Sequence, residues 1–101
     1  MITEWWIERG ALMTWAGQGR IQSRVITGDA VDGDLHARKG EWLVVRADGR
    51  VELLEARLAI PVRTFSRRGI RARWIGDLVQ VQENDGRTRI YDYSGFLQRV
   101  V

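Results

Sequence analysis

The stretch EWLVVRADGRVELLEARL, residues 41–58, decides the fold that the sequence predicts. Two β-rich runs flank Asp48 and Gly49, and both of these residues tolerate the positive φ that a two-residue type I′ hairpin needs. We therefore expect residues 42–46 to pair antiparallel with residues 51–58.

Charged residues interrupt the second run of this hairpin. Strict alternation moves the apolar side chains to the other face at Leu53 and Leu54, which predicts either a β-bulge or different environments for the two halves. Glu52 is expected outside, near the turn. Glu55 and Arg57 are then the pair that could meet inside or at an interface.

Turn residues recur along the whole chain. Eleven glycines and several Asp-Gly pairs separate short β-rich runs, and no segment carries apolar residues at helical spacing. Asn84, Asp85 and Gly86 predict a second hairpin, and Pro61, which has no N–H to donate, should mark a strand end or an edge. Further strands are expected at residues 3–8, 11–15, 21–26, 35–38, 62–65, 70–75, 78–82, 87–93 and 96–100.

The number and shortness of these runs predict an all-β fold in a single domain, residues 1–101. We expect about eight short strands, which are too many for one open sheet with protected edges. A small antiparallel β-barrel, closed or nearly closed, resolves this problem, and a two-sheet β-sandwich is the alternative.

Composition excludes several kinds of site. The 101 residues are 45% hydrophobic and 29% charged, and they include no cysteine and a single histidine, His36. Disulfides, thiolate chemistry and sites that need two imidazoles are therefore excluded. The N-terminal MITEWWIERG carries acids where a signal peptide carries bases, which predicts a cytoplasmic protein with no membrane partner.

An acidic segment holds Asp29, Asp32, Asp34 and His36 within eight residues. Its spacing does not match a calcium loop, and Asp and Gly are also the residues that successive turns use. We expect turns here, with neither a metal nor a cofactor.

A basic segment, RTFSRRGIRARW, occupies residues 63–74. Interleaved arginine and aromatic residues are typical of a nucleic-acid surface. Alternation offers a second interpretation, an amphipathic strand with Ala72 and Trp74 on its inner face. The arginines are Arg63, Arg67, Arg68, Arg71 and Arg73.

Five tryptophans suit either a core or the wall of an apolar cavity. Trp5 and Trp6 are adjacent, so they point to opposite faces if they lie on a strand. One of them is then exposed or lies in an interface, which predicts a homodimer.

The segment RTRIYDY places Arg87, Arg89, Tyr91 and Tyr93 on one face of a predicted strand. Phenols and guanidinium groups on one face could line a polar pocket, with tyrosine as an acid or hydrogen-bond donor. A solvated face with half-buried tyrosines is the alternative.

The order of these motifs, in residues 19–58 and 85–96, resembles a bacterial family of unknown function with an allene oxide cyclase-like, or calycin-like, barrel. The resemblance implies a small β-barrel that acts by shaping a cavity rather than by covalent catalysis. The matching positions are Gly19, Arg20, Ile21, Thr27, Gly28, Trp42, Arg46, Asp48, Gly49, Ala56, Arg57, Asp85, Gly86, Ile90, Tyr91 and Gly95.

These observations favour a domain that binds a small, largely apolar molecule and that could also isomerise or cyclise it. A nucleic-acid- or protein-binding module using residues 63–74 is the alternative. The expected catalytic residues are Tyr91 or Tyr93 as acid, Glu55 as base and Arg57 or Arg46 as anion stabiliser. The expected ligand-binding residues are Trp42, Arg46 and His36.

Overall fold

The computed structural model describes residues 2–16, 21–26, 28–56 and 59–101, which contain eleven β-strands and no helix. All strand pairs are antiparallel, so the all-β prediction is confirmed. No helix in the described ranges is long and apolar enough to span a membrane.

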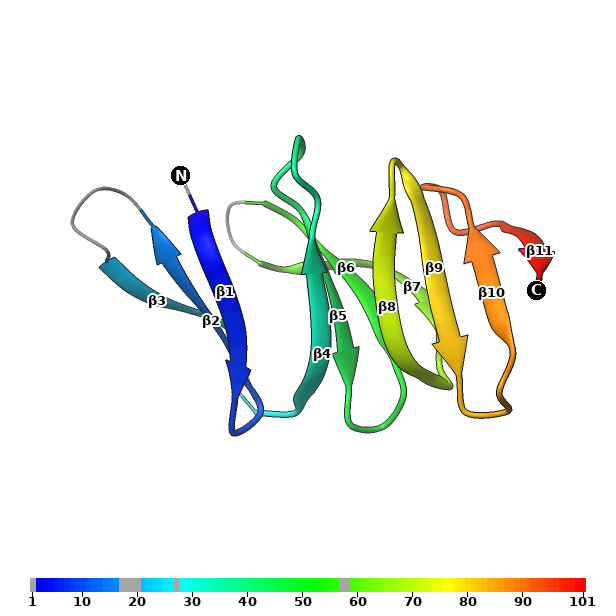
Figure 1. Ribbon diagram of the computed structural model, residues 1–101, viewed down its shortest axis with the longest axis horizontal. Coiled ribbons are helices and arrows are strands. Elements are labelled where there is room, and N and C mark those ends of the chain that lie inside the picture. The colour runs from blue at the N-terminus through cyan, green and yellow to red at the C-terminus, as the bar shows by residue number, and fades with distance from the viewer. Residues whose placement is uncertain (1, 17–20, 27, 57–58) are drawn as a thin grey trace.

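The strands form three sheets, which follow one another along the molecule (Figure 1). The first sheet contains β1 (Ile2–Glu8), β2 (Ala11–Ala16) and β3 (Ile21–Ile26). The second contains β4 (Ala30–Leu35), β5 (Trp42–Arg46), β6 (Val51–Leu54) and β7 (Pro61–Ser66). The third has the order β11-β10-β9-β8, with β8 (Gly69–Ile75), β9 (Leu78–Glu83), β10 (Thr88–Tyr91) and β11 (Leu97–Val100). Among the described residues, these sheets do not close into a hydrogen-bonded barrel.

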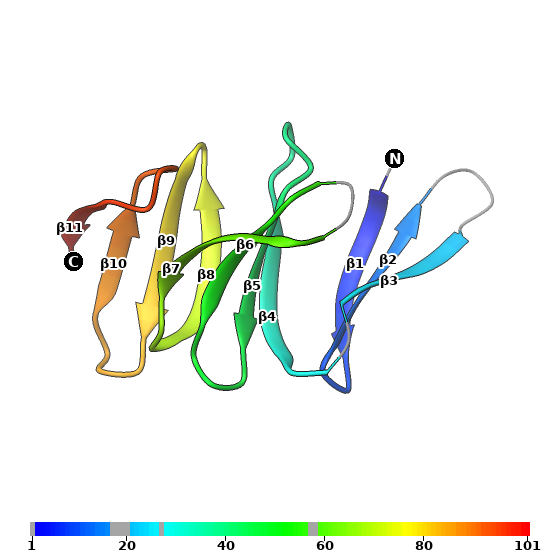
Figure 2. The same ribbon diagram turned by 180° about the vertical axis from the view of Figure 1, so that it is seen from behind.

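The hairpin β5–β6 is buried on both faces, because each face packs against a different sheet. One face joins β7 and the third sheet in a core, with β7 crossing in front of β8 and β9 (Figure 2). That core contains Leu43, Val45, Val51, Leu53, Phe65, Ala72, Val79, Val81 and Tyr91. The other face forms a second core with the first sheet, from Leu12, Ala30, Trp42, Val44 and Leu54.

The apolar residues on both faces of β6 are explained by burial of both faces. Leu53 belongs to one core and Leu54 to the other, as ordinary alternation requires. The pairing of β6 with β7 shifts register at this point, but the residue without a counterpart, Val62, lies on β7. β6 ends at Leu54, which is earlier than expected.

Alternation predicted that Glu52 lies outside, and this prediction is wrong. Its exposed fraction is 6%, and its carboxylate accepts a hydrogen bond of 2.8 Å from Arg46 Nε. Arg46 Nη1 also donates to Asp29 Oδ1 at 3.0 Å. Burial lowers the pKa of Arg46, but the bonds to Glu52 and Asp29 outweigh it and raise that pKa overall. A doubly buried hairpin needs such a pairing, because an unpaired buried charge is strongly destabilising.

The turn between β5 and β6 differs from the predicted type I′ turn. Gly49 has a φ of +96°, whereas Asp48 is not among the residues with positive φ. Arg46 N binds Arg50 O at 2.8 Å and Gly49 N binds Arg46 O at 2.9 Å, which is the pattern of a three-residue loop with a left-handed glycine at its end. The same two backbone bonds close residues 83–87 and residues 92–96.

Side-chain carboxylates join the second sheet to the third. The edge strands β4 and β8 run in the same direction (Figure 1). Asp32 Oδ2 accepts a hydrogen bond from Ala72 N at 3.0 Å, and Asp34 Oδ2 accepts one from Trp74 N at 2.8 Å. We call this line of contacts the β4–β8 seam.

The seam corrects the interpretation of the acidic segment. Asp32 and Asp34 lie on β4 rather than in turns, and the predicted strand at residues 35–38 is mostly loop. The partners of these two aspartates lie forty residues along the chain. Pro61, as predicted, begins an edge strand, β7.

The adjacent tryptophans of β1 point to different neighbours. Trp5 packs edge-on against the buried Trp42, with ring centroids 5.8 Å apart. Trp6 lies 5.7 Å from Trp15, and both of these are half-buried. The homodimer inferred from this pair stays a prediction.

We expect Asp34→Ala to lower the free energy of unfolding by about 1–2 kcal/mol, because the N–H groups of Trp74 and Leu35 lose their acceptor. Asp34→Asn keeps an amide oxygen and should lose less than half as much. Urea denaturation of both variants checks this expectation. Equal losses in the two variants would contradict a role for Asp34 as an acceptor.

Candidate functional site

The described residues form a groove of about 440 Å³ between the β4–β5 loop and the β8–β9 turn. Leu35, Ala37 and Trp74 give it apolar surface, and His36, Arg38 and Asp77 give it polar groups. We call it the histidine groove. It lies beside the β4–β8 seam, so the hydrogen bond that Trp74 N donates to Asp34 positions one of its walls.

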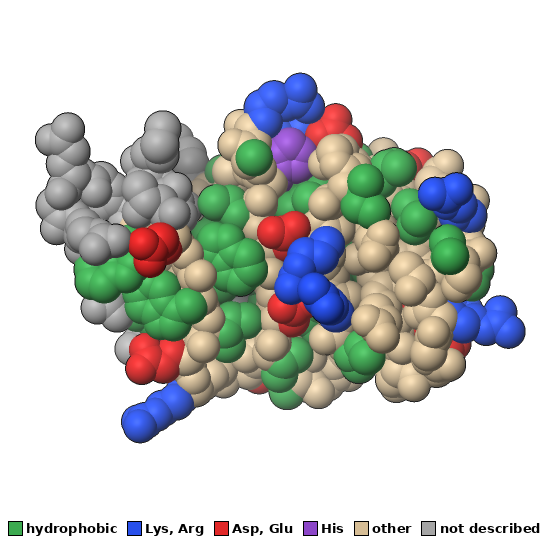
Figure 3. Space-filling view, in the orientation of Figure 1, with side chains coloured by type: hydrophobic (Ala, Val, Ile, Leu, Met, Phe, Trp, Pro, Cys, Tyr) green, Lys and Arg blue, Asp and Glu red, His purple; other side chains and the backbone are tan. Residues whose placement is uncertain are grey.

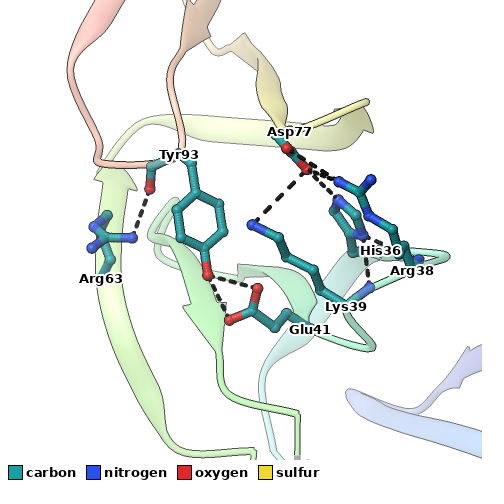
Figure 4. Close-up of polar contacts among 7 residues, drawn as sticks. All are labelled: His36, Arg38, Lys39, Glu41, Arg63, Asp77 and Tyr93. Carbon is teal, nitrogen blue, oxygen red and sulfur yellow. Dashed lines mark hydrogen bonds and ion pairs between the residues drawn. The ribbon is translucent and has the colours of Figure 1, made fainter.

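His36 joins the two sides of the histidine groove (Figure 4). Its Nδ1 accepts N–H bonds from Arg38 at 3.2 Å and Lys39 at 3.0 Å, and its Nε2 lies 2.8 Å from Asp77 Oδ1. A nitrogen that accepts hydrogen bonds carries no proton, so the ring proton lies on Nε2 and is donated to Asp77. Both ring nitrogens are therefore engaged, and the histidine holds the loop to the turn.

The carboxylate of Asp77 interacts with His36 and with two nearby cations, Arg38 and Lys39. The hydrogen bond from His36 is the main reason that the pKa of Asp77 is lowered, and the charges of Lys39 and Arg38 add to it. Arg38 Nη2 lies 3.3 Å from each carboxylate oxygen. Asp77 is thus held as a carboxylate at the rim of the groove.

Behind the groove wall, Trp74 stacks on Tyr93 with ring centroids 6.2 Å apart and planes 24° apart. The ammonium of Lys39 lies 3.7 Å from the centre of the Tyr93 ring, a cation–π contact. Arg63 Nη1 donates to the carbonyl oxygen of Tyr93 at 2.6 Å (Figure 4). The contacts with Lys39 and Arg63 fix Tyr93, the ring on which Trp74 stacks.

The phenol of Tyr93 is bound to Glu41. Its hydroxyl lies 2.7 Å from both carboxylate oxygens. This hydrogen bond is the largest cause that raises the pKa of Tyr93, and burial adds to it. Tyr93 is therefore a neutral hydrogen-bond donor, and its proton is already engaged.

A second groove, of about 400 Å³, lies beside the β7–β8 turn. We call it the serine groove, since Ser66 Oγ donates to the buried Glu83 at 2.6 Å. Arg89 also binds this carboxylate, and Tyr91 Oη lies 3.5 Å from it. Burial, followed by the charge of Glu83, raises the pKa of Tyr91. These donors converge on one carboxylate, and the network fastens the turn to β9 and β10.

The two tyrosines predicted to share a pocket lie in different clusters. β10 ends at Tyr91, and Asp92 begins a turn that carries Tyr93 to the histidine groove side. Glu55 is half-buried after β6, and Arg57 lies outside the described residues. The predicted catalytic residues are thus not brought together as a set.

The predicted ligand-binding residues also separate. His36 lines the histidine groove. Trp42 lies in the second core, 2% exposed, and Arg46 pairs with Glu52 and Asp29 at the end of the hairpin.

The five arginines of the basic segment occupy three places. Arg63 binds Tyr93, and Arg67 and Arg68 line the serine groove. Arg71 and Arg73 lie on the outer face of β8, opposite the buried Ala72, so the predicted alternation on this strand is confirmed.

Sequence reasoning missed Arg38, Lys39, Glu41, Asp77 and Glu83 as parts of these clusters. Glu83 had a local signal, because it shares its parity on β9 with the buried Val79 and Val81. Asp77 had no local signal of this kind, because it lies in a two-residue turn and its partner His36 is 41 residues away.

Metal binding has no support among the residues that the structure describes, since no three histidine or carboxylate side chains gather in one place. Asp29 binds Arg46, Asp32 and Asp34 bind β8, and His36 binds Asp77.

We expect Glu41→Gln to lower the pKa of Tyr93 towards the ordinary tyrosine value of about 10. Because the folded-state pKa is raised, the neutral phenol contributes stability below the unfolded-state pKa, and this contribution is lost as the pH rises through the folded-state pKa. The variant should therefore lose less stability at alkaline pH. Phenolate absorbance titration checks the pKa, with Tyr91→Phe to isolate the Tyr93 signal; an unchanged titration would count against the Glu41 contact.

We expect Asp77→Asn to flatten the acid dependence of stability. The folded-state pKa of Asp77 is lowered, so its contribution is present above the unfolded-state value of about 3.9 and is lost as the pH falls through the folded-state value. Urea unfolding of both proteins between about pH 2 and 6 checks this expectation. If the variant shows as steep a dependence as the native chain, Asp77 does not gain this stabilisation from His36.

No protein-family model and no curated protein matches the chain. The barrel family that residues 19–58 and 85–96 resemble stays a prediction from those residues.

Proposed function

We propose that this chain binds a small, largely apolar molecule in the histidine groove. One observation carries the proposal: Leu35, Ala37 and Trp74 provide apolar surface next to a fixed polar pair, His36 and Asp77. Small-molecule sites combine mostly apolar walls with a few placed polar groups in this way.

The size of the groove supports this proposal. Its volume of about 440 Å³ lies within the range of about 300–1,000 Å³ that small-molecule sites occupy. The serine groove is of similar size, but its lining is dominated by Ser66, Glu83 and two arginines, which suits an apolar molecule less well.

The walls of the histidine groove are held in place by contacts within the chain. Tyr93 stacks on Trp74, and two backbone hydrogen bonds, from His36 N to Glu41 O and from Gly40 N to His36 O, close the loop. A preformed site spends little of its binding free energy on ordering side chains.

Arg38 is the group best placed to orient a ligand. Its side chain is 75% exposed, and its contacts with Asp77 are long, at 3.3 Å. A hydrogen-bond acceptor on the bound molecule can take up the remaining N–H groups of this guanidinium.

The proposal is binding rather than isomerisation or cyclisation. Proton transfer needs a group that can release or accept a proton at the groove. Both nitrogens of His36 are engaged, the lowered pKa of Asp77 makes its carboxylate a weak base, and the proton of Tyr93 is bound by Glu41.

We also propose that the second and third sheets together form an open β-barrel. Its two openings lie between β4 and β8 and between β7 and β10, where side chains replace the backbone hydrogen bonds of a closed barrel. Asp32 and Asp34 bridge β4 to β8, and Arg63 on β7 reaches the carbonyl oxygen of Tyr93 after β10. The core shared by these sheets lies between the two bridges, and the histidine groove lies at one mouth.

Tryptophan fluorescence against a panel of small apolar molecules tests the proposed function. We expect a saturable change that is lost in Ala37→Arg, because the new side chain fills the groove. Ala47→Arg is the matched control, since Ala47 is an exposed alanine in the β5–β6 turn, away from the groove. Thermal unfolding establishes that both variants fold.

Three results would overturn the proposal. The first is no saturable response to any member of the panel, and the second is equal binding by Ala37→Arg and the native chain. The third is retention on DNA or RNA that falls steeply with salt and is lost when Arg67, Arg68 and Arg71 are all replaced by alanine, which would favour the nucleic-acid alternative.

A further inference from the structure

A third groove, of about 270 Å³, lies on the outer face of the third sheet, away from the histidine groove. Its lining is entirely polar: Arg71, Arg73, Gln80, Gln82 and Thr88. We call it the arginine groove. Nothing in the proposed function uses it.

Strand register explains why these side chains converge. Arg71 is paired with Gln82, and Gln82 with Thr88, so three neighbouring strands contribute one row. Arg73 is paired with Gln80 in the next row. Directly opposed residues project to the same side of a sheet, and adjacent strands lie about 4.8 Å apart. Guanidinium, amide and hydroxyl groups therefore surround a space a few ångströms wide on rigid strands.

The charge of the arginine groove is positive. Arg71 is exposed, and it forms no ion pair with any residue in the described part of the chain. Arg73 Nη1 binds Asp32 Oδ2 at 2.7 Å and Ala72 O at 2.6 Å, which fixes this guanidinium and balances the nearby carboxylate. Among the residues that the structure describes, no carboxylate lines the groove itself.

The space-filling view shows this arrangement. A group of basic side chains lies over β4 and β8 between two acidic ones, and the surface over β9 and β10 beside it is mostly uncharged and not hydrophobic (Figure 3). The basic groups thus border a polar surface rather than a hydrophobic one.

We propose that the arginine groove binds the phosphate group of a small phosphate-bearing molecule. Arginine presents a planar fork of donors that matches phosphate oxygens, and the amides and hydroxyl supply further donors. The described residues of the lining include no aromatic side chain on which a base could stack, so recognition is of the phosphate rather than of a nucleic-acid strand.

Phosphorus NMR line broadening with inorganic phosphate, at constant ionic strength, tests the site. We expect saturable binding of one phosphate per chain, and similar binding of a nucleoside monophosphate. Arg71→Ala should weaken it about tenfold or more, since a charge-assisted hydrogen bond is lost. Gln82→Glu, which adds a negative charge at nearly constant shape, should abolish it.

Arg87→Ala is the matched control. It removes the same charge from an exposed position in the β9–β10 turn, outside the groove lining. Its phosphate affinity should equal that of the native chain, and thermal unfolding shows whether each variant folds.

The proposal fails if native protein binds neither phosphate nor the nucleoside monophosphate saturably. It also fails if Arg87→Ala weakens binding as much as Arg71→Ala, because the effect is then diffuse charge. Retention of an oligonucleotide without phosphate binding would overturn it in favour of an extended phosphodiester surface. None of these results depends on the histidine groove.

Discussion

The hairpin β5–β6 packs against a different sheet on each face, and this double burial determines where the other strands can lie. Leu43 and Leu53 face the core shared with the third sheet, whereas Trp42 and Leu54 face the first sheet. A strand pair that is buried on both faces has no solvent-exposed side for charged residues, so its strands are mostly apolar. Its buried ion pair, between Arg46 and Glu52, therefore lies beside the turn, where Asp29 and Arg50 also contact it.

The third sheet reaches its place through contacts from two sides of this hairpin. The β4–β8 seam fastens one side, and the buried Glu83 network fastens the β7–β8 turn on the other. The histidine groove forms where the seam ends, so its tryptophan wall and its histidine come from different sheets. Its shape is consequently a property of how two sheets dock, rather than of any one segment.

Local rules predicted much of this fold. Short β-rich runs and Asp-Gly turns placed most strands within a few residues, and Pro61 marked an edge as expected. The errors share a cause: Asp32 and Glu52 were assigned from their sequence neighbours, but their partners were set by packing. An aspartate next to a glycine predicts a turn. The local sequence is the same whether the carboxylate accepts a hydrogen bond from its own backbone or from a strand forty residues away. The same limit applies to the site, where alternation placed Tyr91 and Tyr93 together although β10 ends between them.

The carboxylates of the β4–β8 seam also affect whether β8 can pair with a strand of another molecule. A strand at the border of a sheet normally offers unpaired N–H groups to any passing chain, and this is a common route to aggregation. On β8, the N–H groups of Ala72 and Trp74 are already taken by Asp32 and Asp34. A strand from a second molecule would have to displace two charged acceptors to add here. The two aspartates that complete the fold therefore also protect it against edge-to-edge self-association.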